Sequence, residues 1–244
     1  MELVQNITKK IIKLSEKQLE KVTLIGIDGP TASGKTTIAN SIKNELEKRS
    51  KKCLVFGLDW TLIDRSLRVN DLENLKKSSN SFEYEAELHM DIKKCQQFLS
   101  NVQRFNEREI DDTPIDKNLV LKNLYSRDHE GQCVGTAEFN LEPGMIIILE
   151  GHYTLRNELD KHIDYNIVLL GELEEFLQRK VDRVKGYRSV DDAKDYYWRI
   201  DVPSFKNHNA RFGINADLIV DNTDYNNPKI KEKGYINYWS NLTN

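Results

Sequence analysis

Short apolar runs alternate with amphipathic segments along most of this chain. Two segments have their apolar residues at helical spacing, Thr36–Lys48 and Leu173–Val184. The apolar runs have the length of buried strands and lie at Val22–Ile27, Cys53–Leu58, Met145–Leu149, Ile167–Leu170 and Leu218–Val220. Continuous apolar strands that alternate with helices predict an α/β fold, in which a parallel sheet has helices on both faces.

The stretch from about residue 69 to residue 143 interrupts this alternation. It contains a helical pattern at Tyr84–Leu99, a polar loop around Asp111–Pro114 and a hairpin-like region around Glu130–Gln132. Insertions in parallel-sheet proteins usually lie over the strand ends. We therefore expect this insertion to shape a pocket; a surface decoration is the alternative.

The remaining segments favour a single domain, with a core at about 20–225 and a polar tail at 226–244. An amphipathic helix is expected near the N-terminus, where the apolar residues of segment 7–14 are interrupted by lysines. Candidate docking contacts in the tail are Tyr235, Tyr238 and Trp239.

Composition restricts the class of protein. With 39% hydrophobic and 31% charged residues, the 244-residue chain has enough apolar material for one sizeable core and too much for a disordered protein. Its formal charge of −3 argues against a nucleic-acid-binding surface, and its apolar runs are too short to span a bilayer. Cys53, Cys95 and Cys133 lack metal-ligand spacing, so we expect reduced thiols and a cytoplasmic location.

One motif is specific for phosphate binding. Gly29–Thr36 reads Gly-Pro-Thr-Ala-Ser-Gly-Lys-Thr and matches the G-x-x-x-x-G-K-[ST] loop, between a predicted strand and a predicted helix. Glycines let the backbone curl so that successive N–H groups point at phosphate oxygens, and the helix adds the positive end of its dipole. The predicted nucleotide contacts are Gly29, Thr31, Ala32, Ser33, Gly34, Lys35, Thr36 and Thr37.

Four side chains suit the chemistry of phosphoryl transfer. Lys35 would neutralise charge on the outer phosphates, and the Thr36 hydroxyl would ligate Mg²⁺. Glu150 ends an apolar strand and precedes Gly151, which suits a second magnesium contact because a buried carboxylate without a cation would be costly. Asp59 follows the second strand, where we favour a base that accepts the proton of an attacking hydroxyl; a helix N-cap is the alternative.

Basic residues cluster at the end of a later predicted helix, at Arg179, Arg183, Lys185 and Arg188. Arginines over a nucleotide would stabilise the transferring phosphoryl group and exclude water. Taken alone, the spacing favours the alternative of a solvated helix face paired with nearby acidic residues. Candidate pocket residues in the insertion, which a decorated loop would also explain, are Tyr125, Arg127 and His129.

With these residues in place, the chain resembles the uridine kinase and phosphoribulokinase group of P-loop kinases from about residue 22 to residue 220. Ile25–Thr37 is similar to the group's phosphate loop, and Leu58-Asp59 stands at the position of its catalytic aspartate. Segments similar to the group's Glu-Gly strand end, its arginine-bearing lid and its Pro-x-Phe are Leu149–Gly151, Arg179–Arg188 and Val202–Phe205.

The resemblance implies a P-loop kinase with an acceptor-binding insertion and an arginine-bearing lid, which uses ATP, or GTP, with Mg²⁺. It implies that Asp59 is the base, that Arg183 and Arg188 contact phosphates, and that Arg179 contacts the nucleotide. The residues that it places near the acceptor are Glu83, Tyr125 and His129. The implied partner is a small-molecule acceptor, a nucleoside such as uridine or cytidine or another sugar-like polyol. A phosphoribulokinase-like or pantothenate kinase-like acceptor is the alternative.

The acceptor side departs from the group's pattern. Trp60–Ile63 replaces the usual serine and aromatic residues, Glu83 replaces an aspartate, and Phe176 stands where nucleoside kinases often carry an arginine. The sequence therefore supports a kinase more firmly than it supports uridine. A tRNA prenyltransferase-like transferase and a nucleotide-binding module are the remaining alternatives, and a homo-oligomer is compatible with the sequence.

Overall fold

A six-stranded sheet forms the centre of the computed structural model, which describes residues 2–69, 89–107, 118–126, 129, 131–186 and 188–241. The strands follow the order β2-β5-β1-β6-β7-β8. Their bounds are Thr23–Asp28 (β1), Cys53–Gly57 (β2), Ile146–Glu150 (β5), Tyr165–Leu170 (β6), Leu218–Asp221 (β7) and Lys229–Lys231 (β8). Neighbouring strands are parallel except β7 and β8, so the predicted α/β fold is confirmed and β8 is an unexpected antiparallel edge.

Burial on both faces explains the continuous apolar strands. Every residue of β1 and β6 is buried, as expected of a parallel sheet between two layers of helices. The parallel register also pairs Gly57 at the end of β2 with Glu150 at the end of β5. Side chains that follow these two strands therefore meet at one edge of the sheet.

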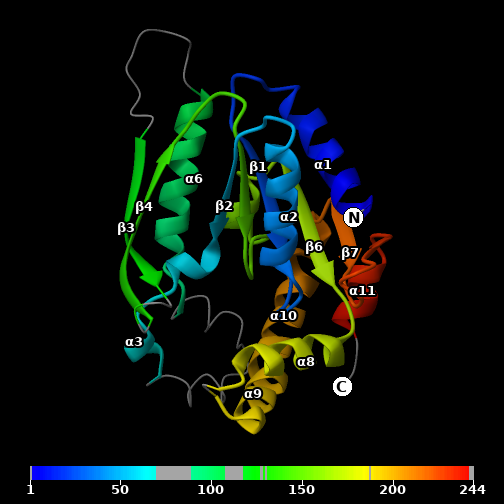
Figure 1. Ribbon diagram of the computed structural model, residues 1–244. Coiled ribbons are helices and arrows are strands. Elements are labelled where there is room, and N and C mark those ends of the chain that lie inside the picture. The colour runs from blue at the N-terminus through cyan, green and yellow to red at the C-terminus, as the bar shows by residue number, and fades with distance from the viewer. Residues whose placement is uncertain are drawn as a thin grey trace.

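Two helices, α1 (Glu2–Ser15) and α2 (Lys35–Glu47), lie on one face of the sheet (Figure 1). As predicted, α1 is amphipathic: it buries Leu3, Ile7 and Ile11 in the same core as residues of α2. This layer supports α2, whose first turn follows the phosphate-binding loop.

The opposite face, on the side of β2 and β5, is covered by α6 (Ile92–Glu107) and the hairpin of β3 (Asn118–Ser126) and β4 (Gln132–Asn140). Phe98 of α6 stacks on Phe56 of β2 with 4.4 Å between ring centroids. β3 and β4 pair antiparallel, which confirms the predicted hairpin. The helix predicted at residues 84–99 begins later than expected, at Ile92, and extends to Glu107. Residues 90 and 91 are not helical, and residues 84–88 lie outside the described part.

A third core joins α10 (Val202–Phe212) and α11 (Tyr235–Ser240) to β6 and β7. Trp239 of α11 is fully buried, and its Nε1 donates to the Gly171 carbonyl at 2.7 Å. The prediction that this tryptophan docks the C-terminal tail is therefore confirmed. Short elements complete the described fold: η1 (Leu58–Thr61), α7 (Asn157–Asp160), the π-helical η2 (Tyr197–Asp201) and η3 (Gly213–Asn215).

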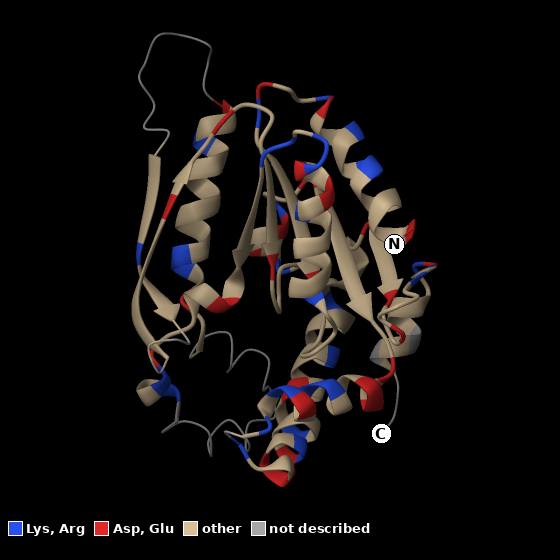
Figure 2. Cartoon of the chain, viewed as in Figure 1, with Lys and Arg blue, Asp and Glu red and all other residues tan. Residues whose placement is uncertain are grey.

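Beyond the carboxyl ends of the parallel strands, α3 (Arg65–Val69) lies on one side, and α8 (Leu173–Val184) and α9 (Val190–Tyr196) lie on the other (Figure 1). Acidic and basic residues are interspersed along α8 and α9 (Figure 2). Within the described part of the chain, no helix is both long and apolar enough to cross a membrane.

Candidate active site

The phosphate-binding loop joins the end of β1 to the start of α2. Its backbone passes through the left-handed region at Ala32 (φ 60°) and Gly34 (φ 92°). A Cβ atom on Gly34 would lie 2.7 Å from Nδ2 of Asn222, and this amide donates to the Ser33 carbonyl at 2.7 Å. Glycine is therefore required at residue 34 for its φ angle and for the close approach of Asn222.

Lys35 folds back onto the loop that precedes it. Its Nζ donates to the carbonyls of Gly29 and Pro30, each at 2.8 Å, and the residue is buried. Burial lowers the pKa of Lys35, while the negative charges of Glu150, Asp28 and Asp59 act in the opposite direction. The lysine thus lies within the electrostatic reach of both strand-end carboxylates that the sequence singled out.

Thr36 and Glu150 meet where the sequence predicts a magnesium site. The Thr36 hydroxyl donates to Oε1 of Glu150 at 3.0 Å, which joins the first turn of α2 to the end of β5. Hydroxyl and carboxylate oxygens are ligands that Mg²⁺ prefers, and the remaining positions are usually filled by water and substrate phosphates. The side chains of Thr36 and Glu150 therefore fit a Mg²⁺ ion.

Glu150→Gln should weaken Mg²⁺-dependent nucleotide binding. The amide keeps the size of the side chain but removes the charge that attracts the cation, so we expect the half-saturating Mg²⁺ concentration to rise on the order of tenfold. Titration of Mg²⁺ against a fluorescent ATP analogue measures this. Glu142→Gln, which removes a surface carboxylate paired with Lys52, is the control. An equal shift in both variants would contradict the metal role.

A cleft of about 600 Å³ opens at this edge of the sheet. Its walls come from the phosphate loop, the ends of β2 and β5, α3, the insertion and the elements that follow β6. Of the residues predicted for one site, the cleft brings together Lys35, Thr36, Asp59, Tyr125, Glu150 and Arg183.

Asp59 and Trp60 line the cleft from η1, the helical turn after β2. Trp60 packs edge-on against Phe56 at 5.3 Å and stacks on Phe139 at 6.4 Å, so it belongs both to the cleft wall and to the core beneath. The insertion adds Met90 and other residues to the lining. It therefore shapes the cleft, as the interruption of the strand–helix alternation predicted.

A second hollow, of about 400 Å³, adjoins the phosphate loop on the side of α8. Arg179 has its guanidinium 5.2 Å from the Phe176 ring centroid and 5.5 Å from that of Tyr225, and its Nη1 donates to the Asn222 carbonyl at 2.9 Å. Thr37 also lines this hollow. Aromatic and guanidinium surfaces beside a phosphate loop suit a nucleotide base, and contact of Arg179 with the nucleotide stays a prediction.

The two lid arginines occupy different positions. Arg183 lines both the cleft and the second hollow. Arg188 lines neither; its guanidinium lies 5.3 Å from the ring centroid of Tyr196, which does line the cleft. The structure thus brings Arg183 directly to the site, whereas Arg188 lies beside a cleft residue and is exposed.

The residues predicted to contact the acceptor do not all lie in the cleft. Tyr125 lines the cleft, whereas His129 is exposed outside it, with Nδ1 2.9 Å from the hydroxyl of Ser126. Glu83 lies outside the described residues. Contacts of His129 and Glu83 with an acceptor therefore stay predictions.

His152 is a cleft residue that the sequence analysis missed. It comes two residues after Glu150 and lines the cleft between the phosphate loop and α8. Burial and the positive charge of Lys35 lower the pKa of His152 well below its usual value. The imidazole is therefore neutral at pH 7, and its position just past the strand end that carries Glu150 was the available signal.

Comparison with known proteins places these features in a family. The sequence model of the phosphoribulokinase / uridine kinase family matches residues 24–227, which include the phosphate loop, Asp59, Glu150 and the α8 arginines. The chain belongs to this family. The matched residues therefore include every described residue that lines the cleft or the second hollow.

One curated relative matches most of this chain but only part of its own length. Uridine-cytidine kinase D from Dictyostelium discoideum is 26% identical over 196 residues, which are 79% of this chain and 33% of that protein. The chain thus spans about a third of the length of this curated relative.

Two solved structures of kinases share the fold. A D-glycerate 3-kinase from Cryptococcus neoformans has a TM-score of 0.65 at 13% identity, over 94% of this chain and 99% of that one. A phosphoribulokinase from Rhodobacter spheroides has a TM-score of 0.55 at 13% identity, over 83% and 70% of the two chains. At such identities the likeness concerns the fold.

Proposed function

We propose that this protein transfers the γ-phosphoryl group of a magnesium-bound nucleoside triphosphate, ATP or GTP, to a hydroxyl group of a small polyhydroxylated molecule. The observation that carries the proposal is the shared cleft of Asp59, Lys35, Thr36 and Glu150. A phosphate loop alone serves many activities, but a carboxylate facing the same cleft supplies the group that an attacking hydroxyl needs.

Each residue has a defined part in this reaction. The acceptor oxygen forms a bond to the γ-phosphorus as the bond to the β-phosphate oxygen breaks, and the hydroxyl proton passes to Asp59. Lys35 and Arg183 bind the negative charge of the transferring group. Thr36 and Glu150 would hold Mg²⁺, which neutralises charge on the β- and γ-phosphates when bound.

Two classes of acceptor have support. Trp60 and Tyr125 give the cleft aromatic surfaces for a nucleoside base, and a relative of the chain carries the name uridine-cytidine kinase. Arg68 favours a second class, acceptors with an anionic group. It lines the same cleft, where its Nε donates to the Ile63 carbonyl at 3.1 Å and its guanidinium lies 4.8 Å from the Tyr125 ring centroid. A guanidinium held in this way suits carboxylate or phosphate recognition.

A panel of acceptors tests the proposal. Nucleoside diphosphate release from ATP or GTP with Mg²⁺ should rise with at least one of uridine, cytidine, ribulose 5-phosphate, D-glycerate, pantothenate and simple sugars. Arg68→Gln should raise KM for an anionic acceptor by about tenfold or more and leave that of a neutral one unchanged, whereas exposed Arg65→Gln should change neither. Hydrolysis that no acceptor stimulates would contradict the transferase and favour a nucleotide-binding module.

A further inference from the structure

A carboxylate lies buried beneath the phosphate loop, outside the cleft. Asp28 is the last residue of β1, and its side chain is fully buried, as is that of His208 in α10. Oδ2 of Asp28 lies 2.9 Å from Nε2 of His208, and the two residues are 180 positions apart in the sequence. Neither residue takes part in the proposed phosphoryl transfer.

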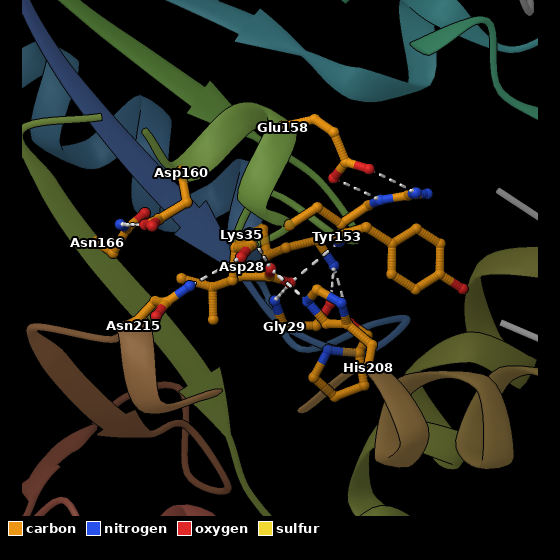
Figure 3. A network of polar contacts seen from close by, with 12 residues as sticks. Asp28, Gly29, Lys35, Tyr153, Glu158, Asp160, Asn166, His208 and Asn215 are labelled. Carbon is orange, nitrogen blue, oxygen red and sulfur yellow. Dashed lines mark hydrogen bonds and ion pairs between the residues drawn. The ribbon is translucent and has the colours of Figure 1, made fainter. Parts of the chain in front are cut away.

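The Asp28 carboxylate joins three segments of the chain (Figure 3). Oδ1 accepts from the backbone N–H of Gly29 at 2.7 Å and from that of Tyr153 at 3.2 Å. Oδ2 accepts from the backbone N–H of Leu155 at 2.9 Å as well as facing His208. An ionised carboxylate is purely an acceptor, so this set of donors matches it, and the imidazole completes the set by donating from Nε2.

Two of these segments carry the residues of the proposed chemistry. Gly29 begins the phosphate loop, and Tyr153 follows directly after the Glu150–His152 segment that enters the cleft. Tyr153 has a φ of 73° and is buried. A non-glycine residue persists in this region only when its surroundings hold it there, and the bond from its N–H to Asp28 does so.

His208 is held in turn by the aromatic core around it. The rings of Tyr153 and Phe205 lie 5.1 Å and 5.5 Å from its imidazole, measured between centroids. The burial of Asp28 would raise the pKa of its carboxyl, but His208 and the backbone donors outweigh this and hold the pKa below its ordinary value. The Asp28 carboxylate is therefore a fixed, ionised acceptor at the base of the loop.

We propose that Asp28 and His208 are positioning residues, which hold the phosphate loop and the Glu150–His152 segment in the relative placement that the Mg²⁺–nucleotide complex requires. The inference rests on the proposed function for its effect on turnover, but its effect on nucleotide binding does not depend on any acceptor. One buried carboxylate thereby couples the loop that binds phosphates to the strand end that would hold the metal.

Substitutions at His208 test this proposal. His208→Leu removes the donor and keeps an apolar side chain, whereas His208→Gln can still donate to Asp28. We expect His208→Leu to weaken Mg²⁺–ATP binding on the order of tenfold and to lower kcat by up to about 100-fold with the acceptor KM unchanged, because small displacements of catalytic groups are costly. His208→Gln should recover most of both losses.

Further variants serve as controls, and they separate an effect on folding from an effect on the proposed activity. His162→Gln, a histidine that does not line the cleft, should leave both quantities unchanged. If His208→Leu does not fold, Asp28→Asn and His208→Gln provide the same comparison, since both keep most of the packing. Wild-type Mg²⁺–ATP affinity and kcat in folded His208→Leu or Asp28→Asn would overturn the positioning role. A wild-type protein that binds Mg²⁺–ATP but phosphorylates no acceptor would contradict the kinase alone, and the binding comparison would still decide this inference.

Discussion

Asp59→Asn should lower kcat by about 10²–10⁴-fold and leave the Mg²⁺–ATP dissociation constant unchanged. The amide has nearly the same size but cannot accept the proton of the acceptor hydroxyl. Asp59 lies in η1 at the end of β2, whereas the phosphates would be held from the loop between β1 and α2, so removing a negative charge near Lys35 should not weaken nucleotide binding. Rapid-quench measurement of the first turnover, beside equilibrium binding of nucleotide, separates the two effects.

Asp91→Asn is the matched control for this experiment. Asp91 follows the cleft residues His89 and Met90 but does not itself line the cleft, and it pairs with Lys94 at 3.6 Å. Asparagine retains the ability to cap a helix, so kcat should stay close to wild type. Full turnover in Asp59→Asn would contradict the base. The alternative of a helix N-cap is wrong, because Asp59 lies within η1 and Gly57 is the N-cap of that turn.

The phosphate loop and the two strand-end carboxylates were predictable from the sequence. The loop is a local motif, and the carboxylates are marked by the apolar runs that they end. The loop is recognised from consecutive residues, and its context between β1 and α2 needs only short-range patterns. Asp59 and Glu150 are far apart in sequence, but each ends an apolar run, and the carboxyl ends of parallel strands meet at one edge. The β2–β5 register, with Gly57 beside Glu150, confirms that reasoning.

The parts that were missed depend on long-range pairing. His208 lies on an ordinary amphipathic helix, and nothing near it in the sequence indicates Asp28 as its partner. The edge strand β8 consists of Lys229–Lys231, which is too short and too polar for an apolar pattern to reveal. Arg68 became a cleft residue only once the folded chain placed α3 along the same cleft as the strand ends.

The charged residues of α8 take part in both exposed and buried ion pairs. Taken alone, their spacing favoured a solvated basic face, and Lys185 does form an exposed pair with Asp182. Lys180, on the same helix, instead forms a buried ion pair with Asp201, with side-chain exposures of 6% and 8%. Helical periodicity identifies which residues share a face, but it does not say that a lysine will find a buried aspartate on η2.

Lys180→Met should therefore lower the free energy of unfolding by about 3–5 kcal/mol, because it leaves Asp201 buried without its cation. Methionine fills much of the space of the lysine stem beside Tyr196 and Tyr197, so lost packing contributes little. Lys185→Met removes an exposed lysine–aspartate pair at the end of the same helix and should change the free energy of unfolding by less than about 1 kcal/mol. Urea unfolding of the two variants beside the wild type measures the difference.

The pH dependence of this loss identifies its cause. Burial raises the pKa of Asp201 above its ordinary value, and Lys180 opposes that shift, so the pKa should rise further in Lys180→Met. A carboxyl whose pKa is higher in the folded state destabilises the fold increasingly as the pH rises through that pKa, and not at all below the pKa of the unfolded chain. The loss should thus be greatest above about pH 7 and smaller near pH 5, which is closer to the ordinary pKa of an aspartate in the unfolded chain. A loss that is equal at both pH values would show that the lysine acts through packing and not through its charge.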